Sequence, residues 1–476
     1  EKTAMEAALG MSYAGKRTMV CMKHVGLNVA ADAFVNSAIT GVNGGIIIVS
    51  ADDPSMHSSQ NEQDSRALAK FAMIPVLEPA NQQEAYEMTY QGFELSEKYK
   101  VPVMLRLTTR LAHSRSGVKT MPEISQNNLA LPEDPVQFVL LPAIARKRYK
   151  ILLNNQQHFM EEAELSENNK FIDGEDKSLG IIACGIAYNY LAENYEDFNV
   201  PYPVLKIGQY PLPKSKVKQL SETCDEILIL EEGYPVYEEL LKGYLEKEKI
   251  RGRMDGTLPR DGELNPGIVA RALKIEQTGG KPVPELVTNR PPSMCNGCSH
   301  ADMFNALNEA LSEYGPGRVF SDIGCYTLGA LPPYNAINSC VDMGASVTMA
   351  KGAADAGLFP AVAVIGDSTF THSGITGLLD AVNDNSPVTI IIADNSTTAM
   401  TGGQQSSGTG KLDKICEGLG VEPSHIRIVN PLKRLHEENV KVLKEELAYR
   451  GVSVVIPQRE CIQTASRRKK EAKTNQ

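Results

Sequence analysis

Residues 361–397 read AVAVIGDSTFTHSGITGLLDAVNDNSPVTIIIADNST and carry the pattern that decides the fold class. Two apolar runs, 361–365 and 388–393, have the length and the β-branched content of buried strands. Between them, apolar residues recur at helical spacing across 375–382. A strand, a helix and a second strand in this order predict a βαβ unit whose two strands are parallel.

Polar residues follow each of these two strands. Gly366, Asp367 and Ser368 come after the first strand, and Asn395 follows the second, 28 positions beyond Asp367. Ligands of open parallel sheets lie outside the carboxyl ends of the strands, so we expect these side chains to lie close together. Mg²⁺ takes one or two protein oxygens and completes its shell with phosphates, and glycine lets a backbone approach a phosphate. The pattern predicts a site for Mg²⁺ and a diphosphate, and the alternative is an ordinary βαβ unit with polar loops.

This arrangement resembles the thiamine-diphosphate motif, in which Gly-Asp-Gly is followed further along the chain by Asn. Ser368 stands where the motif usually has its second glycine. The resemblance implies that Asp367 and Asn395 bind Mg²⁺ through their side chains, with the Thr397 carbonyl as a third protein ligand. It also implies that Gly366 and Ser368 approach the diphosphate at a helix N-terminus, which favours negative charge.

Length, charge and cysteine content narrow the class of protein. The 476 residues allow about three domains. The net charge of −10 argues against nucleic acid as a partner, and the absence of a long apolar run argues against a membrane span. Nine cysteines without a secretory signal indicate reduced thiols or metal ligands, as in a cytoplasmic enzyme. Because Glu1 is not a start methionine, we expect the native N-terminus to lie upstream of it.

Strand-like and helix-like segments alternate along the chain, which predicts an α/β fold with several doubly wound parallel sheets. We expect further strands at 45–50, 101–107, 179–184 and 226–230, and helices at 83–98 and 234–249. Polar residues dominate 119–177, and proline and glycine are frequent after 251, so both stretches read as linkers, the first with some helix. The expected division is into blocks 1–118, 178–250 and 285–462, linkers 119–177 and 251–284, and a solvated basic tail, 463–476.

A group of cysteines shares the third block with the predicted diphosphate site. Cys295 and Cys298 form a C-x₂-C pair, and Cys325 follows on a second loop. Three thiolates are suited to zinc or to an iron–sulfur cluster, and both need a fourth ligand. A lone C-x₂-C is most often a pair of buried thiols, but its place beside a diphosphate site favours a metal centre. The candidates for the fourth ligand are Cys340, Cys416, Cys461 and His300.

Longer stretches of the chain resemble the 2-oxoacid:ferredoxin oxidoreductases, and within them the α subunits of indolepyruvate ferredoxin oxidoreductases. The resemblance covers nearly the whole chain. Two segments of that family have no counterpart in this sequence: an N-terminal segment with a Gly-Thr-Pro loop, and a C-terminal ferredoxin-like domain with paired cysteine clusters. The matching stretches are MKHVGLN at 22–28, DDP at 52–54, HSSQNEQD at 57–64, TTR at 108–110, DIGCYTLGA at 322–330 and GGQ at 402–404.

The resemblance implies a transketolase-like architecture that binds thiamine diphosphate, Mg²⁺ and a [4Fe–4S] cluster. Block 1–118 corresponds to the pyrimidine-binding domain, block 178–250 to the transketolase C-terminal-like domain, and block 285–462 to the diphosphate-binding domain with the cysteines. In the family, thiamine diphosphate lies between a pyrimidine-binding and a diphosphate-binding domain, within one chain or across a dimer interface.

The resemblance also implies the reaction, an oxidative decarboxylation of a 2-oxoacid such as indolepyruvate. CoA accepts the acyl group and ferredoxin accepts the electrons, in an oligomer that includes a smaller β subunit. Three cysteines, Cys295, Cys298 and Cys325, match the ligands of the cluster, and Cys461 is the best positional match for the fourth.

Two further residues match catalytic positions of the family. Glu1, in the sequence EKTA at 1–4, matches the end of a segment whose glutamate acts on the aminopyrimidine of thiamine. A surface residue at a frayed end is the alternative. Arg110 resembles an arginine that meets the substrate carboxylate, for which its planar fork is suited, and a surface ion pair is the alternative. The run with His57, Gln60, Asn61 and Glu62 after a strand end indicates either part of a site or a solvated loop.

Other functions remain possible on these residues. A non-oxidative thiamine-dependent decarboxylase, or an acetolactate-synthase-like enzyme, uses the same Mg²⁺ site but has no need of the three clustered cysteines. A catalytically silent scaffold that binds a diphosphate has no need of two Mg²⁺ ligands. A structural zinc site is a third explanation of the cysteines, and iron analysis separates it from a cluster.

Overall fold

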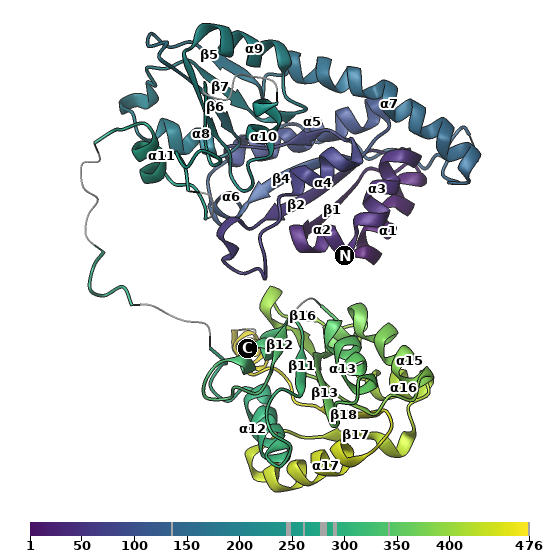
Figure 1. The fold of residues 1–476 in the computed structure, drawn as a ribbon. Coiled ribbons are helices and arrows are strands. Elements are labelled where there is room, and N and C mark those ends of the chain that lie inside the picture. The colour runs from purple at the N-terminus through teal and green to yellow at the C-terminus, as the bar shows by residue number, and fades with distance from the viewer. Residues whose placement is uncertain are drawn as a thin grey trace. The chain divides into compact units, whose positions relative to one another are not determined.

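The computed structural model describes residues 1–134, 137–243, 249–259, 262–276, 283–288, 293–340 and 343–474. The chain divides into two compact units, unit 1 at Glu1–Pro282 and unit 2 at Val283–Gln476 (Figure 1). Each unit is built on mostly parallel strands with helices packed against them, which confirms the α/β class with several parallel-sheet domains. No helix in the described part of the chain has both the length and the hydropathy that crossing a bilayer demands.

Unit 1 opens with a five-stranded sheet, the first sheet, in the order β1-β2-β4-β3-β8. All of its pairs are parallel except β3 with β8. Strands β2 and β4 lie at the expected positions, and their apolar runs are continuous because both faces of the sheet are covered. The strands are β1 (Thr18–Lys23), β2 (Ile46–Asp52), β3 (Val76–Leu77), β4 (Val103–Thr108) and β8 (Gln209–Tyr210).

Six helices accompany the first sheet. The longest of them, α5, lies where the periodicity predicts a helix, and it packs on β2 and β4. Its start is set by Asn81, whose side chain accepts a hydrogen bond of 2.9 Å from the backbone N–H of Glu84. The six are α1 (Lys2–Tyr13), α2 (His24–Val29), α3 (Ala31–Thr40), α4 (Ser65–Ala72), α5 (Gln82–Tyr99) and α6 (Thr109–His113).

A second five-stranded sheet, in the order β10-β9-β6-β7-β5, completes unit 1. Strands β6 and β9 begin and end at the expected residues. Its strands are β5 (Lys170–Ile172), β6 (Leu179–Cys184), β7 (Val204–Ile207), β9 (Glu226–Leu230) and β10 (Ile250–Arg251). Its helices are α8 (Ala187–Ala192), α9 (Lys214–Thr223), α10 (Val236–Lys242) and α11 (Pro266–Ala272).

The first and second sheets share one hydrophobic core. Residues of both, such as Ile48 and Ile182, belong to the same cluster of buried side chains. The 24-residue helix α7 (Pro142–Leu165) adds Leu152 and Phe159 to that cluster, so much of the stretch expected as a linker with some helix is packed structure. Burial of α7 against a common core explains why two sheets form one compact unit.

Unit 2 contains a six-stranded sheet, the third sheet, in the order β12-β11-β13-β14-β18-β17. All of its pairs are parallel. The expected βαβ unit is confirmed, with β13, the helical segment 367–383 and β14. The strands are β11 (Val319–Ser321), β12 (Ser339–Cys340), β13 (Ala361–Gly366), β14 (Val388–Ala393), β17 (Ile426–Val429) and β18 (Ser453–Pro457).

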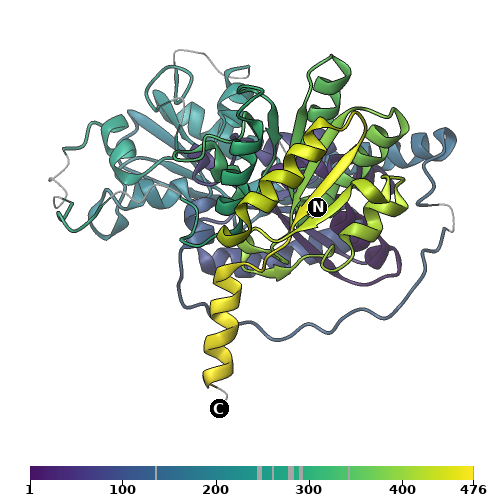
Figure 2. The same cartoon turned by 90° about the horizontal axis from the view of Figure 1, so that it is seen from below.

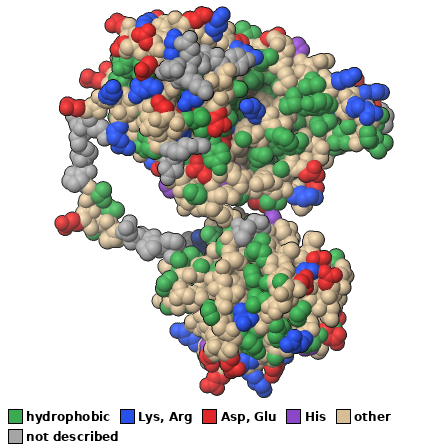
Figure 3. All heavy atoms as spheres, viewed as in Figure 1, with side chains coloured by type: hydrophobic (Ala, Val, Ile, Leu, Met, Phe, Trp, Pro, Cys, Tyr) green, Lys and Arg blue, Asp and Glu red, His purple; other side chains and the backbone are tan. Residues whose placement is uncertain are grey.

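Helices cover the third sheet, and a short hairpin of β15 (Thr397–Thr398) and β16 (Gln404–Gln405) lies beyond β14. In Figure 3, charged side chains of both signs gather at the lower end of unit 2, where α17 lies. The opposite face of helix α17 is buried in unit 2. Figure 2 shows α18 extending away from the rest of unit 2. The helices are α12 (Ser299–Leu311), α13 (Ala345–Asp355), α14 (Asp367–Thr369), α15 (Ile375–Asn383), α16 (Leu412–Gly418), α17 (His436–Ala448) and α18 (Ile462–Thr474).

Parts of the remaining expectations fall on residues outside the described ranges. The helix expected at 234–249 is present as α10, and residues 244–248 are not among those described. The expected linker at 251–284 contains α11 and buries Leu258 and Leu264 within unit 1, but 260–261 and 277–282 lie outside the description. The tail expected at 463–476 is helical as far as Thr474.

Candidate active site

Two predicted site residues, Asp367 and Asn395, follow neighbouring strands at the same edge of the third sheet. Strands β13 and β14 pair in parallel with Gly366 opposite Ala393. Asp367 begins α14 directly after β13, and Asn395 lies two residues beyond β14. The fold therefore brings Asp367 and Asn395 to the carboxyl edge of the sheet, where open α/β sheets bind ligands.

Asp367 is buried but incompletely paired. The residue is 3% exposed, and its Oδ2 atom has no hydrogen-bond partner among the described residues. Burial and, after it, the negative charge of Asp394 raise the pKa of Asp367 to about 7, while a hydrogen bond from Ser406 acts in the opposite direction. A buried carboxylate oxygen without a partner is unfavourable, and a cation at this position would compensate it.

The neighbouring side chains are held in fixed positions. The Oδ1 atom of Asn395 accepts the backbone N–H of Thr397 at 3.1 Å, and both residues are buried. Asp394 accepts the backbone N–H of Ser396 at 2.9 Å through Oδ1, and the side-chain amide of Gln458 at 2.7 Å through Oδ2. Because both oxygens of Asp394 already accept hydrogen bonds, Asp367 is the carboxylate with a free oxygen at this edge.

These donors suit a hard divalent cation that is shared with phosphates. Across the described ranges, no three His, Cys, Asp or Glu side chains lie close enough together to hold a metal ion. A magnesium ion held by one carboxylate, one amide and phosphate oxygens does not require such a group. Ser368, at the unusual position of the motif, pairs its hydroxyl with that of Thr398 at 2.8 Å. The assignment of Mg²⁺ to Asp367, Asn395 and Thr397 stays a prediction.

Gly366 is required by its packing. Its backbone angles, φ −80° and ψ 157°, are open to any residue, but a Cβ atom would lie 2.6 Å from Cε1 of Tyr326. The hydroxyl of Tyr326 donates a hydrogen bond to Asp322, whose other carboxylate oxygen accepts the hydroxyl of Ser346 at 2.6 Å. The ring of Tyr326 is thus fixed against Gly366, which explains the glycine independently of any diphosphate.

The four cysteines predicted as cluster ligands lie near one another in unit 2. Burial and, after it, the charges of Cys298, Cys461 and Cys295 raise the pKa of the Cys325 thiol to about 11. Burial likewise raises the pKa of Cys298, with added contributions from Cys295 and Cys461. A cation bound among them would favour the thiolate forms of Cys325 and Cys298. Four thiols have the chemistry that an iron–sulfur cluster or zinc requires, but among the described residues they do not lie close enough together to hold a metal ion. Ligation by these cysteines therefore stays a prediction.

The segment after β18 connects these cysteines to the sheet edge. The backbone N–H of Cys461 donates to the carbonyl of Asn395 at 3.1 Å, and that of Arg459 donates to the carbonyl of Asp394 at 3.0 Å. The Arg459 guanidinium also donates to the carbonyl of Gly297 at 3.2 Å, within the C-x₂-C loop. The side-chain amide of Gln463 lies 3.4 Å from Sγ of Cys295. The segment thus ties the cysteine loop to the end of β14.

The other candidates for a fourth ligand differ in their surroundings. Cys416 lies in a hydrophobic core cluster of unit 2, and the Sγ atom of Cys340 lies 3.7 Å from the carbonyl of Asp322. His300 is buried, and neither ring nitrogen has a partner among the described residues. Burial and, after it, the charge of Arg459 lower the pKa of His300 to about 4. Of these candidates, Cys461 is the one that raises the pKa of Cys325.

A second polar edge lies in unit 1, at the carboxyl ends of β1, β2 and β4. His24 and Thr108 are buried there, and their Nδ1 and Oγ1 atoms have no partner among the described residues. The Nε2 atom of His24 lies 3.2 Å from the carbonyl of Asn61, which can only accept, so Nε2 carries the proton. Both residues fall within stretches that match the family, and the sequence alone does not mark either of them as a site residue.

Glu1 lies close to this edge. It precedes α1, is half-buried, and has its side chain against α2, the helix that follows β1. A Cβ atom added to Gly26 would lie 2.4 Å from Cγ and 2.9 Å from Oε1 of Glu1. The close approach explains why residue 26 is glycine, and it shows that the Glu1 side chain packs against the protein.

Arg110 lies two residues beyond β4, in α6, and is tied to a residue that the sequence did not single out. Its guanidinium forms an ion pair with Oε1 of Glu263, and His57 approaches Oε2 of the same carboxylate at 3.2 Å. Arg110 also lies over the ring of Tyr190, with its guanidinium carbon 5.9 Å from the ring centroid. Glu263 falls in a stretch read as a linker, where no local pattern marks it.

The polar run between His57 and Asp64 is a folded loop. Glu62 accepts the backbone N–H of Ser55 at 2.9 Å through Oε2, and its carbonyl accepts the hydroxyl of Tyr234 at 2.6 Å. Gln60 and Asn61 are exposed, although the carbonyl of Asn61 receives His24. The loop is thus held by groups from both sheets of unit 1, and its part in the site stays a prediction.

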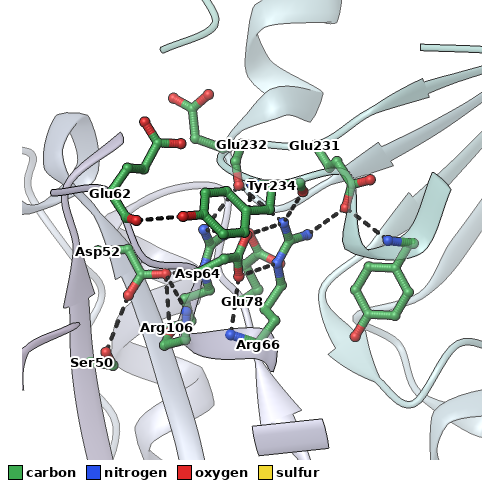
Figure 4. Close-up of polar contacts among 12 residues, drawn as sticks. Ser50, Asp52, Glu62, Asp64, Arg66, Glu78, Arg106, Glu231, Glu232 and Tyr234 are labelled. Carbon is green, nitrogen blue, oxygen red and sulfur yellow. Dashed lines mark hydrogen bonds and ion pairs between the residues drawn. The ribbon is translucent and has the colours of Figure 1, made fainter. Parts of the chain in front are cut away.

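Beneath this edge lies a buried ion-pair network that joins the two sheets of unit 1 (Figure 4). Arg106 pairs with Asp52 at 2.7 Å and also with Glu78, while Arg66 pairs with Asp64 at 2.5 Å and with Glu231 at 2.9 Å. Burial alone would raise the pKa of Asp64, but Arg106 and Arg66 lower it to about 2. The network holds the loop that begins at Asp52 in place.

Comparison with known proteins identifies the family. Residues 1–163 match "Pyruvate flavodoxin/ferredoxin oxidoreductase, thiamine diP-bdg", and residues 322–456 match "Thiamine pyrophosphate enzyme, C-terminal TPP binding domain". The chain is 39% identical over 501 residues to indolepyruvate oxidoreductase subunit IorA of Archaeoglobus fulgidus, across 99% of this chain and 79% of that protein. The chain belongs to the IorA family of thiamine-diphosphate-dependent 2-oxoacid:ferredoxin oxidoreductases.

A second IorA relative, from Methanothermobacter thermautotrophicus, is 38% identical over 495 residues, across 97% of this chain and 78% of its own. Among solved structures, a 2-oxoglutarate:ferredoxin oxidoreductase from Magnetococcus marinus shares 18% identity at a TM-score of 0.31, over 37% of this chain and 66% of that chain. A likeness this weak carries no argument, and membership of the IorA family rests on the sequence matches. The family match confirms the resemblance and the use of thiamine diphosphate.

Proposed function

We propose that this IorA-family subunit catalyses the oxidative decarboxylation of a 2-oxoacid, an aryl pyruvate such as indolepyruvate. A 2-oxoacid anion, CoA and two oxidised ferredoxins give acyl-CoA, CO₂, one proton and two reduced ferredoxins. The bond to the substrate carboxylate breaks, a carbon–sulfur bond to CoA forms, and ferredoxin takes up the two electrons. The proposed partner is a smaller β subunit, and the proposed location is the cytoplasm.

The observation that carries this proposal is the hydrogen bond of 3.1 Å between the amide of Cys461 and the carbonyl of Asn395. It joins a residue proposed to hold an electron-transfer cluster to a residue proposed to hold the cofactor's metal. A non-oxidative decarboxylase has no use for four neighbouring cysteines at this edge. The arrangement therefore favours the oxidative reaction.

In unit 2, we propose that Asp367, Asn395 and the Thr397 carbonyl hold Mg²⁺, with Gly366 and Ser368 next to the diphosphate. The unpaired Oδ2 atom of Asp367 supports a cation there. When bound, thiamine diphosphate supplies a nucleophilic carbon and an electron sink for the substrate's cleaved bond. The protein contributes a preformed edge, in which Asn395 is already oriented by its hydrogen bond to Thr397.

We propose that Cys295, Cys298, Cys325 and Cys461 hold a [4Fe–4S] cluster, which supplies one-electron transfer. The raised pKa values of Cys325 and Cys298, to which the neighbouring cysteines contribute after burial, support a shared cation. Arg459 and Gln463 steady the cysteine loop through their contacts with Gly297 and Cys295.

In unit 1, we propose that Glu1 holds or releases a proton on the aminopyrimidine, and that Arg110 binds the substrate carboxylate. The packing of Glu1 against α2 supports a position at the carboxyl edge of the first sheet.

We further propose that residues 1–118 form the pyrimidine-binding domain, residues 178–250 the transketolase C-terminal-like domain and residues 285–462 the diphosphate-binding domain.

The test is to measure iron, acid-labile sulfide, zinc and thiamine diphosphate in the protein purified without oxygen. About four irons and one thiamine diphosphate per chain, with 2-oxoacid-dependent reduction of ferredoxin when CoA and the β subunit are present, are the expected result. Thiamine diphosphate with zinc in place of iron supports a structural metal site. Thiamine diphosphate without either metal supports a non-oxidative decarboxylase, and neither cofactor after reconstitution supports a scaffold.

A further inference from the structure

Glu263 connects two residues at the polar edge of the first sheet. Its Oε1 atom pairs with the guanidinium of Arg110, and its Oε2 atom lies 3.2 Å from Nε2 of His57. The Arg110 side chain is 44% exposed and can be reached from solvent, whereas that of Glu263 is 19% exposed. The carboxylate of Glu263 thus forms an ion pair with an arginine, Arg110, that a ligand can reach from solvent.

The carboxylate is held on a rigid support. The next residue, Leu264, is fully buried, and its backbone N–H donates to the buried carboxylate of Glu232 at 2.8 Å. Asn265 then caps α11 by accepting the backbone N–H of Ile268 at 3.0 Å. Glu263 is therefore presented to Arg110 by an anchored backbone and differs from the flexible acids of ordinary surface ion pairs.

A further polar group lies beside the same arginine. Tyr190, on α8, packs its ring against Arg110, and its hydroxyl is buried with no hydrogen-bond partner among the described residues. Buried hydroxyls are normally paired, so an unpaired one beside an arginine indicates a position where a ligand oxygen completes the hydrogen bonding. Arginine, tyrosine hydroxyl and histidine are all suited to a carboxylate.

We propose that Glu263 takes the place of the substrate carboxylate in the free protein. Its side chain pairs with Arg110 until the carboxylate of a 2-oxoacid displaces it. This rests on the proposed role of Arg110. Two carboxylates on one guanidinium repel each other, so the substrate carboxylate and Glu263 compete for it. On displacement, Glu263 keeps its contact with His57, and the hydroxyl of Tyr190 donates to the incoming 2-oxoacid. Glu263 is thus a positioning residue that sets the affinity for substrate through Arg110.

The experiment compares the wild type, Glu263→Gln, Arg110→Ala and a control, Glu97→Gln. Glu97 pairs with Arg17 at 2.7 Å in the same unit, and its side chain is 23% exposed, close to the value for Glu263. Calorimetry with phenylpyruvate as the probe gives Kd, and steady-state reduction of a viologen dye by the complete complex with CoA gives KM and kcat. We expect Glu263→Gln to lower Kd and KM two- to tenfold without a matching gain in kcat, Glu97→Gln to match the wild type, and Arg110→Ala to raise Kd at least tenfold.

Unchanged or weaker binding by Glu263→Gln overturns the proposal. Tighter binding by Glu263→Gln that persists in an Arg110→Ala background also overturns it, because the effect would not act through Arg110. Wild-type protein that turns over no 2-oxoacid, but binds phenylpyruvate more tightly after Glu263→Gln, refutes the proposed function and retains the competition at Arg110.

Discussion

The backbone amide of Cys461 donates a hydrogen bond to the carbonyl of Asn395 across a distance of 3.1 Å. The two residues are far apart in sequence, and they meet because β14 and β18 are parallel neighbours in the third sheet. A cysteine proposed to hold a cluster is thereby fixed relative to a residue proposed to hold Mg²⁺. A fixed distance between two such sites suits electron transfer.

We expect Cys461→Ala to lose most of the bound iron while it keeps thiamine diphosphate, because three cysteines remain but the cluster needs four ligands. Iron and sulfide analysis with cofactor quantification measures both. Cys340→Ala is the matched control, since Cys340 is also half-buried in unit 2 and does not raise the pKa of Cys325. Full iron content in Cys461→Ala would contradict this ligand assignment.

We expect Asp367→Asn to stabilise the cofactor-free protein and to weaken binding of thiamine diphosphate. The substitution removes a buried charge whose Oδ2 atom is unpaired, for a gain of about 1 kcal/mol in the free energy of unfolding. It also removes the proposed anionic Mg²⁺ ligand, so the Kd for thiamine diphosphate with Mg²⁺ rises tenfold or more. Denaturant unfolding and calorimetry measure the two effects, and Mg²⁺-dependent binding equal to the wild type would rule out Asp367 as a ligand.

We expect Arg66→Met to destabilise unit 1 by about 3–5 kcal/mol, because it leaves Glu231 buried without its arginine and Asp64 with the longer contact of 3.4 Å to Arg106. Chemical denaturation followed by circular dichroism measures the change. Arg251→Met is the control, since the pair of Arg251 with Glu226 is partly exposed and is worth about 1 kcal/mol or less. Equal losses in the two variants would show that the buried network adds little stability.

The buried carboxyl of Glu232 predicts a pH dependence of stability. Burial raises its pKa to about 7, although Leu264, Arg253 and Arg106 oppose the shift. Since the folded-state pKa lies above the ordinary value of 4.5, the folded protein binds a proton that the unfolded chain releases. The stability that this group contributes is full below pH 4.5 and is lost as pH rises through about 7.

Glu232→Gln is therefore expected to flatten the fall in unfolding free energy between pH 5 and 8, with a difference from the wild type on the order of 1 kcal/mol. Denaturant titrations at each pH measure it, and the amide keeps the size of the side chain. A difference profile that is level across this range would contradict the raised pKa.

Local sequence accounts for much of the fold. The strands at 179–184, 226–230 and 388–393 lie where apolar runs predict them, because short runs rich in branched aliphatic residues favour buried strands over helices. The positions of Asp367 and Asn395 at one edge also follow from the βαβ pattern, since parallel strands end on the same side.

The tertiary structure alone decided which distant residues meet. The order of strands in the third sheet placed Cys461 at the carbonyl of Asn395, and a common core brought Glu263 to Arg110 from a stretch that had looked like a linker. The spacing of apolar residues along the sequence indicates which face of a helix or strand is buried. It does not indicate which other element packs against that face. The sequence by itself determined the buried strands with long apolar runs, the thiamine-diphosphate motif and the family. Helices α7 and α11, in stretches read as linkers, and the pairing of Arg110 with an internal carboxylate arose from long-range packing.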